Sequence, residues 1–439
     1  MSGFNLLQHI RKNDNSIVVW LFNIGTEKLW NKGTNALVKD KNEDVIVNHI
    51  EELNLLLTRK TDYVILRKKP DSEYINYLTQ LGFEIPTILC PSVQNEEKSI
   101  SELVLDDKEL LKRLSEINGN HVVYFVPYGV SEFEEKIATL CGMKLIGGSN
   151  QQSVRVNNKI FSKNVAHELG FPAAEEYICT SVDEIKDAYG KLTSKYEKVI
   201  IKMPCNSSGQ GMWVIENENK LNTVCLVIRR ISGKIKNDKW IVEGWIEKEL
   251  DLNMQVYVSD KGDVETFSVK EQLVHETLYV GSVMPSRLTN AQYEKCIYYG
   301  DKIGEYLFQQ GYNGVFGIDA LVDKNEQVIP IIEINGRFTL STYISFIENK
   351  YPLKKIYAFY KRFKVKDKLN FYVLKNMLED KKLLFDGGQG IIIYNSATVD
   401  SELAEGHVRV FCLAIADNYD DIKKIVDETI ELFDGIKEI

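Results

Sequence analysis

The 439-residue sequence predicts a mixed protein, with an open α/β domain first and paired strands with helices after it. In residues 1–150, short apolar strands alternate with amphipathic helices, a pattern that indicates a mostly parallel sheet. From about residue 151 the strands come in pairs separated by turn residues, which indicates antiparallel hairpins. Near residue 350 the chain becomes rich in aromatic residues and lysine. We therefore expect three units, over residues 1–150, 151–350 and 351–439.

Composition argues against several classes of protein. The net charge is −9, whereas proteins that bind nucleic acid or membrane surfaces in general carry a basic excess. The N-terminus lacks the apolar core of a signal peptide, and no stretch approaches the length of a membrane span. The seven cysteines are scattered without a CxxC pair, and no two histidines have metal-ligand spacing. We expect a cytoplasmic protein with reduced thiols.

The first unit contains the elements of a parallel sheet. Apolar runs predict strands over residues 16–22, 62–67, 85–90 and 121–126. Helical periodicity predicts helices over residues 73–83 and 131–142.

The second unit opens with a helix near residues 158–169, which Gly170 ends. Next comes VIIKMPCNSSGQGMWVI (199–215), a strand that ends at Lys202, a loop of small residues, and a second strand. The loop leaves backbone N–H groups free for a phosphate, Lys202 supplies a point charge, and the Ser207 and Ser208 hydroxyls can donate to phosphate oxygens. It is not a P-loop, because GxxxxGK[ST] is absent. An ordinary hairpin turn is the alternative.

The segment WIVEGWIEKELD (240–251) has the features of an adenosine-binding connection. Glu243 ends an apolar strand and could accept a hydrogen bond from the exocyclic amine of adenine, while the exposed main chain that follows reads the ring edge. A further acid, Asp251 or Glu249, could hold the ribose hydroxyls. The alternative is a strand end followed by a charged turn.

Residues 331–338, IIEINGRF, place Glu333, Asn335 and Arg337 at every second position of an apolar strand, so we expect them on one face. Asp319 lies in the apolar strand before the turn, opposite Glu333 if the two strands pair. Two facing acids are costly unless a cation lies between them, and Mg²⁺ prefers oxygen ligands. We therefore predict that Asp319, Glu333 and Asn335 hold Mg²⁺, with Mn²⁺ as a substitute, and that Arg337 meets a phosphate or phosphoryl group. A structural Glu–Arg ion pair is the alternative.

The acceptor side of the site is expected in residues 270–287. Gln272, Ser286 and Arg287 are the candidates for substrate binding, and the planar fork of Arg287 suits a carboxylate. Residues 354–368 hold seven Lys or Arg and a single Asp, so they could dock an acidic partner. The alternative there is the solvated face of a basic helix.

In their order and spacing, these motifs resemble the ATP-grasp superfamily, whose members hold ATP between two α+β subdomains. The resemblance covers residues 155–350. It implies a Rossmann-like α/β domain before a two-subdomain ATP-grasp fold, with a small α+β unit at the C-terminus. The residues that match are Lys159 and Lys202 as phosphate lysines, Ser207, Ser208, Gly209, Gly211 and Met212 in the glycine loop, Glu243, Trp245 and Ile246 at the hinge, Asp251 at ribose, Asp319, Glu333 and Asn335 as metal ligands, and Arg337 and Lys202 as catalytic groups. Asn158 stands where the family often has Asp.

Residues 127–149 and 155–163 are similar to a narrower group, the amino-acid and peptide ligases of antibiotic pathways. This similarity implies that ATP activates an amino-acid carboxylate as an acyl phosphate, which an amine or a carrier-protein thiol then attacks. Glutamate and an acyl carrier protein of aminoglycoside biosynthesis are the expected substrate and partner, and dimers are common for this fold. Three alternatives stay open: an amide ligase without a carrier protein, a carboxylase-type or purine-pathway enzyme, and a non-catalytic ATP-binding module.

Overall fold

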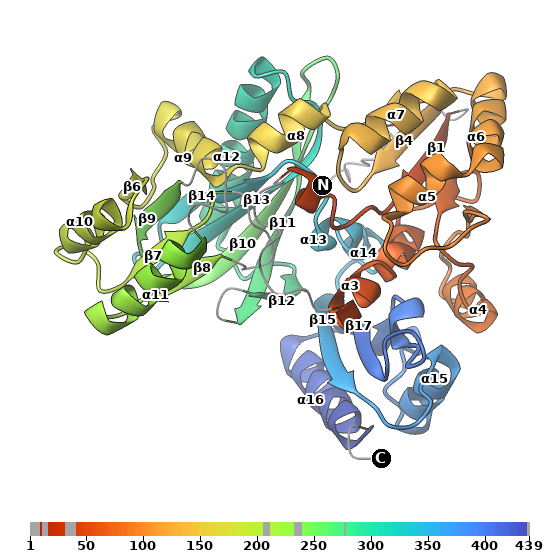
Figure 1. Cartoon of the computed structure of the whole chain (residues 1–439). Coiled ribbons are helices and arrows are strands. Elements are labelled where there is room, and N and C mark those ends of the chain that lie inside the picture. The colour runs from red at the N-terminus through yellow and green to blue at the C-terminus, as the bar shows by residue number, and fades with distance from the viewer. Residues whose placement is uncertain are drawn as a thin grey trace.

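The computed structural model describes residues 9–10, 16–30, 41–204, 211–231, 239–275 and 278–436. Three sheets organise this part of the chain, and Figure 1 shows them side by side with helices on their outer faces. The predicted combination of α/β and α+β architecture is confirmed. No helix in these ranges is long and apolar enough to cross a membrane.

The N-terminal sheet is parallel, with the strand order β3-β2-β1-β4-β5. Its strands are β1 Ile17–Leu21, β2 Tyr63–Ile65, β3 Thr87–Leu89, β4 Val123–Pro127 and β5 Lys144–Leu145. Its helices are α2 Glu27–Trp30, α3 Lys41–Val47, α4 Ser72–Gln80, α5 Ile100–Asp106, α6 Lys108–Asn120 and α7 Glu132–Cys141, with a 3-10 segment at Ile50–Leu56. Local signals explain the bounds of α7, which begins at a Ser131–Glu134 capping box and ends at Gly142 with φ +67°.

Two helices, α8 Asn150–Val156 and α9 Lys159–Glu168, lead into a small four-stranded sheet of order β6-β9-β7-β8. Its elements are β6 Glu176–Cys179, α10 Val182–Leu192, β7 Val199–Lys202, β8 Met212–Ile215, α11 Glu218–Ile231 and β9 Trp240–Gly244. Helices α10 and α11 lie on its outside in Figure 1. Their buried residues form a separate apolar core with the strands.

The largest sheet has eight antiparallel strands in the order β14-β13-β10-β11-β12-β15-β17-β16. The elements up to residue 350 are β10 Lys248–Val258, β11 Val264–His275, β12 Leu278–Met284, α12 Asn290–Gln309, β13 Gly314–Asp323, β14 Val328–Asn335, α13 Leu340–Tyr343 and α14 Ile347–Lys350. Those after it are β15 Lys355–Lys364, α15 Phe371–Asp380, β16 Gly390–Ile393, a 3-10 turn at Ala397–Val399, β17 His407–Ala416 and α16 Tyr419–Ile436. One face of the sheet packs on α9 and α12 around a second core.

The predicted boundary near residue 350 does not separate two cores. Strands β15, β17 and β16 extend the eight-stranded sheet, and one apolar cluster joins Trp20 of β1 to Phe371 of α15 and Ile415 of β17. The boundaries at 150 and 350 stay predictions. The last unit shares its sheet with the second unit and its apolar core with the first.

The prediction of a basic helix face in residues 354–368 is wrong. Residues 355–364 form strand β15, in which apolar side chains such as Phe359 and Phe363 alternate with polar ones. This strand lies in the interior of the sheet, between β12 and β17. Two of the basic side chains have acidic partners within the chain: Lys361 lies 3.3 Å from Asp434, and Arg362 lies 3.4 Å from Glu43.

Candidate active site

Asp319 and Glu333 lie directly opposite each other on β13 and β14, so both carboxylates are on the same face of the sheet. Asp319 Oδ1 accepts hydrogen bonds from Asn253 (2.9 Å) and Gln272 (2.5 Å), and its Oδ2 accepts one from Asn335 (3.0 Å). The strand alternation read from the sequence thus brings the predicted acid pair and Asn335 together.

The acid pair is held by a lysine from outside the sheet. Lys159, at the first turn of α9, is 3% exposed, and its Nζ donates to Glu333 Oε1 at 2.7 Å. Burial and the neighbouring Glu333 raise the pKa of Asp319, although its three hydrogen bonds oppose the increase. A cation bound between the two acids would remove this electrostatic cost.

A second charged cluster forms where the small sheet meets α9. Glu243 of β9 is 2% exposed, and Lys202 at the end of β7 donates to its Oε2 at 2.6 Å. Lys163 of α9 donates to its other carboxylate oxygen. Burial raises the pKa of Glu243, but the two lysines outweigh burial and hold it at about 2. The cluster therefore carries two buried cations and one anion.

Lys163 is not among the site residues predicted from the sequence. The available signal was its spacing of four residues from Lys159, which places both side chains on one face of α9. Helix α9 consequently joins the two sheets, because Lys159 pairs with Glu333 of the large sheet and Lys163 with Glu243 of the small one.

The glycine-rich loop is described only at its ends. Ser207, Ser208 and Gly209 lie outside the described residues. Gly211 has φ +68°, a conformation that favours glycine, and its carbonyl accepts from the Met203 N–H at 2.9 Å. Met212 opens β8 directly opposite Lys202, so the two strands form the hairpin that the sequence predicts.

The hinge residues are partly engaged within the protein. Trp245, just after β9, donates its backbone N–H to the Lys198 carbonyl at 2.9 Å, so that N–H does not face a ligand. Ile246 follows in the same connection to β10. Asp251 lies on β10 opposite Gln272, and Lys248 pairs with its carboxylate at 2.6 Å.

Strand register distinguishes Asp251 from Glu249, the two acids predicted to bind the ribose. The pairing of β10 with β13 shifts between Lys248 and Leu250, and Glu249 is exposed at this irregularity. Asp251 is in register with Asn253 two residues later, so it faces the acid pair. This geometry favours Asp251.

Arg337 does not continue the row of side chains on β14, as the sequence analysis expected. The strand ends at Asn335, and the Arg337 side chain turns toward the N-terminal domain. Its Nε lies 2.9 Å from Glu27 Oε1, and its guanidinium carbon lies 5.2 Å from the centre of the Tyr128 ring. Burial lowers the pKa of Arg337, but Tyr128 and Glu27 outweigh burial, and the net shift is upward.

Of the three predicted substrate residues, only Gln272 faces the acid pair. Arg287 forms an ion pair with Glu271, whose side chain is 3% exposed and points to the opposite face from its neighbour Gln272. Arg287 is therefore engaged on the other face of the sheet, and its assignment as a carboxylate anchor stays a prediction. Ser286 lies after the end of β12, four residues beyond Ser282, which is the partner of Gln272.

A polar network that the sequence analysis missed supports the acid pair. Asn253 Oδ1 accepts from Ser341 at 2.7 Å, and Gln255 Oε1 accepts from Thr342 at 2.5 Å. Both hydrogen bonds connect β10 to the segment that follows Arg337. Polar residues at positions 251, 253 and 255 of an otherwise apolar strand were the signal for this network.

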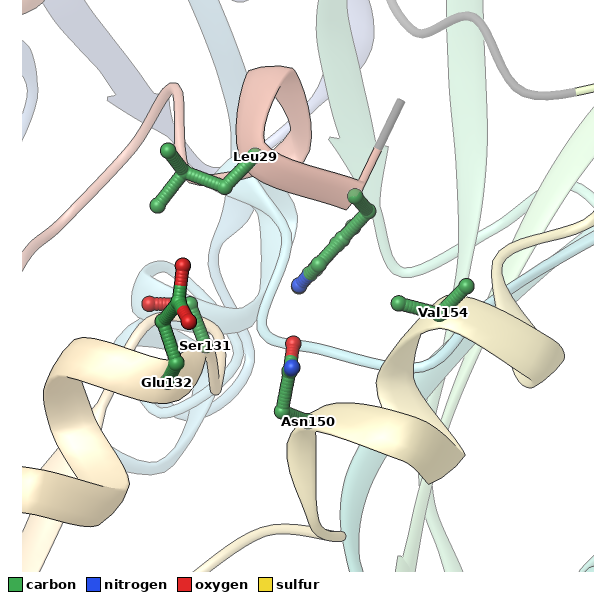
Figure 2. Close-up of a pocket in the computed structure, with 6 residues that line it drawn as sticks. Leu29, Ser131, Glu132, Asn150 and Val154 are labelled. Carbon is green, nitrogen blue, oxygen red and sulfur yellow. The ribbon is translucent and has the colours of Figure 1, made fainter. Parts of the chain in front are cut away.

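A cavity of about 320 Å³ lies between the N-terminal domain and α8. In Figure 2, Leu29 comes from α2, Glu132 begins α7, and Asn150 and Val154 come from α8. The lining residues are Leu29, Trp30, Ser131, Glu132, Asn150 and Val154. The elements on both sides of the cavity contact the residues just after β14. Glu27 of α2 pairs with Arg337, and Asn157, after α8, accepts from the Gly336 N–H at 3.1 Å.

The donor set fits a hard divalent cation. In the described ranges no group of three or more His, Cys, Asp and Glu side chains is suited to a metal ion. Asp319, Glu333 and Asn335 instead combine two carboxylates with an amide, which suits Mg²⁺ when substrate phosphates supply further oxygens.

Comparisons with known families match two parts of this chain. Residues 51–143 match the family described as the pre-ATP-grasp domain, and residues 198–335 match the family described as L-aspartate–L-methionine ligase, ATP grasp. A relative from Niallia circulans, [butirosin acyl-carrier protein]–L-glutamate ligase, is 28% identical over 346 residues, which is 77% of this chain and 76% of the relative. The carbamoyl phosphate synthase large chain of Clostridium botulinum is 23% identical over 52% of this chain and 21% of its own length.

Solved structures show the same fold. An N5-carboxyaminoimidazole ribonucleotide synthetase in complex with ADP aligns with a TM-score of 0.57 at 13% identity, covering 96% of this chain and 97% of that one. Biotin carboxylase from Campylobacter jejuni aligns with a TM-score of 0.59 at 15% identity, covering 93% and 89%.

Proposed function

Because this chain belongs to the ATP-grasp superfamily of ATP-dependent ligases, we propose that it activates an amino-acid carboxylate and joins it to an amine or a thiol. The observation that carries the proposal is the pairing of Asp319 with Glu333, with Asn335 beside them and Lys159 bound to Glu333.

In this proposal Asp319, Glu333 and Asn335 hold Mg²⁺, which neutralises charge on the β- and γ-phosphates when it is bound. Lys159 and Lys202 add positive charge toward the phosphates. Asp251 binds the ribose hydroxyls. Glu243 holds Lys163 and Lys202 in a buried cluster, so both of its carboxylate oxygens have partners and the adenine contact expected from the sequence is not part of this proposal.

The reaction has two steps. A carboxylate oxygen attacks the γ-phosphorus, the bond to the β-phosphate oxygen breaks, and ADP leaves as the acyl phosphate forms. An amine or thiol then attacks the acyl carbon and phosphate leaves with the proton of the nucleophile. Arg337 offers its guanidinium to the oxyanion of this second step. No protein nucleophile is required.

The cavity between α2, α7 and α8 is our candidate for the acceptor. Asn157, after α8, and Glu27, on α2, contact residues 336–337, so the elements that form the cavity also contact the end of β14. Trp30 and Val154 provide apolar surface and Glu132 a carboxylate, which suits an amine on an apolar stem.

The relatives support two specific reactions. The Niallia circulans relative favours glutamate loading onto an acyl carrier protein, in the manner of antibiotic biosynthesis. The L-aspartate–L-methionine ligase family favours an amide between two free amino acids, without a carrier. A carboxylase reaction is a third candidate, because the fold is shared with N5-carboxyaminoimidazole ribonucleotide synthetase.

The test is a panel of the twenty amino acids with the full-length protein, ATP and Mg²⁺, each alone, paired with a second amino acid, or with a carrier-protein thiol. Phosphate release and product mass are measured, and the Asp319→Asn variant is the control. We expect ADP and phosphate in equal amounts with one new amide or thioester. AMP and pyrophosphate would contradict the mechanism, bicarbonate-dependent turnover would indicate a carboxylase, and ATP binding without turnover would indicate a binding module.

A further inference from the structure

Arg337 is held by the N-terminal domain rather than by its own strand. Its side chain is 9% exposed, and the Glu27 carboxylate, 16% exposed, forms its ion pair at 2.9 Å. Glu27 is itself fixed, because its Oε2 accepts from the Gly25 N–H at 3.0 Å and its Oε1 from the Tyr128 hydroxyl at 3.4 Å. The guanidinium also lies over the Tyr128 ring.

The backbone reinforces this arrangement. The Phe338 N–H donates to the Tyr128 carbonyl at 2.9 Å, so the residue after Arg337 is tied to the same domain. Arg337 Nη1 donates to the Phe338 carbonyl at 3.0 Å. The Arg337 Nε lies beside Glu27, and its Nη1 donates to the Phe338 carbonyl. The position of Glu27 therefore sets the direction in which the other N–H groups of the guanidinium point.

We propose that Glu27 is a positioning residue that orients the Arg337 guanidinium for the acyl-transfer step. The inference rests on the proposed function, since it assigns Arg337 to the oxyanion of that step. Glu27 lies on α2, the one-turn helix whose Leu29 and Trp30 line the cavity. An acceptor in the cavity therefore contacts the same helix that holds the arginine, which links acceptor binding to the position of Arg337.

The test compares Glu27→Gln, which removes the charge but keeps the size, with Lys28→Gln as the matched control. Lys28 is on the same helix turn, but its partner is the exposed Asp44 at 2.7 Å. We expect Glu27→Gln to lower kcat for product by 10- to 100-fold, with the KM for ATP within twofold of wild type. Glu27→Asp should recover part of the rate, and Lys28→Gln should match wild type.

A double-mutant cycle with Arg337→Lys separates positioning from a general loss of domain packing. If Glu27 acts through Arg337, the double variant is no slower than Arg337→Lys alone. The inference would be overturned if the kcat losses of the two single variants multiplied in the double variant. It would also be overturned if Glu27→Gln raised the KM for ATP together with its loss of kcat, or if its kcat equalled that of wild type. The proposed function fails separately, if wild type forms no product with any amino acid.

A structure of Glu27→Gln with Mg–ADP gives a readout that does not depend on turnover. We expect the Arg337 guanidinium to leave the Tyr128 ring in that variant and to keep its place in Lys28→Gln. An unmoved Arg337 in Glu27→Gln would refute the positioning role.

Discussion

The Lys159 ammonium lies 2.7 Å from Glu333 Oε1, although the two residues are 174 positions apart in the sequence. This contact joins a predicted phosphate lysine to a predicted metal ligand. In the resting protein, Lys159 compensates one of the two facing acids, while Asn253, Gln272 and Asn335 donate to the other. The predicted magnesium site is therefore stabilised before any ligand binds.

Replacing Asp319 by Asn should abolish turnover and spare the fold. A metal contributes several kcal/mol to phosphoryl transfer, so we expect kcat to fall at least about 100-fold. Because burial and Glu333 raise the pKa of Asp319, removing its charge should leave Tm unchanged or higher. Glu326→Gln, at the exposed turn of the same hairpin, is the control and should behave as wild type. Wild-type turnover in Asp319→Asn would exclude the metal site.

Glu243 should make stability depend on pH at the acidic end. Its pKa is about 2 in the folded protein and 4.5 ordinarily, so the folded state binds its proton less tightly. The stabilisation is present above about pH 4.5 and is lost as pH falls toward 2, with a full size of about 3 kcal/mol. Glu243→Gln should cost about 3–5 kcal/mol at pH 7, because two buried lysines lose their anion.

Urea unfolding of wild type and Glu243→Gln at several pH values between 6 and 3 measures this. We expect the difference between the two proteins to shrink as pH falls. A constant difference would mean that the lysines do not lower the pKa of Glu243.

Lys163→Met should weaken ATP binding, because it removes one of the two cations that the Glu243 cluster presents. A charge-assisted contact is worth about 1.5–3 kcal/mol, so the Kd for Mg–ATP should rise about 10- to 100-fold. Calorimetric titration measures it, and Lys186→Met on the outer helix α10 is the control. An unchanged Kd would restrict Lys163 to a structural role.

Arg287→Gln should separate stability from substrate binding. The substitution leaves the buried Glu271 carboxylate without its partner, and we expect a loss of about 1–3 kcal/mol in the free energy of unfolding. The KM for the amino acid should stay within twofold of wild type, because Arg287 pairs with Glu271 on the face of the sheet away from Asp319. Gln272→Leu, on the acid face, should raise that KM. A large increase in the KM for the amino acid in Arg287→Gln would support the carboxylate-anchor prediction instead.

Local periodicity was enough to derive much of the fold and the pairing of Asp319 with Glu333. Alternation along residues 331–335 predicts that Glu333 and Asn335 share a face, and the turn before them sets Asp319 opposite Glu333. The same reasoning predicts the parallel N-terminal sheet and the hairpin that carries Lys202 and Met212. These features depend on neighbours in sequence, where strand period and turn chemistry act directly.

The remaining contacts depend on how distant elements pack. No pattern in the sequence pairs Lys163 with Glu243, 80 residues away, or turns Arg337 from its strand toward Glu27. Glu271 points to the face of the sheet away from Asp319, and Arg287 pairs with it there. Residues 355–364 form a strand because they pair with β12 and β17 of the large sheet. The physical reason is that a buried charge must find an opposite charge wherever the tertiary fold brings one within reach, and that distance is set by domain packing rather than by local spacing.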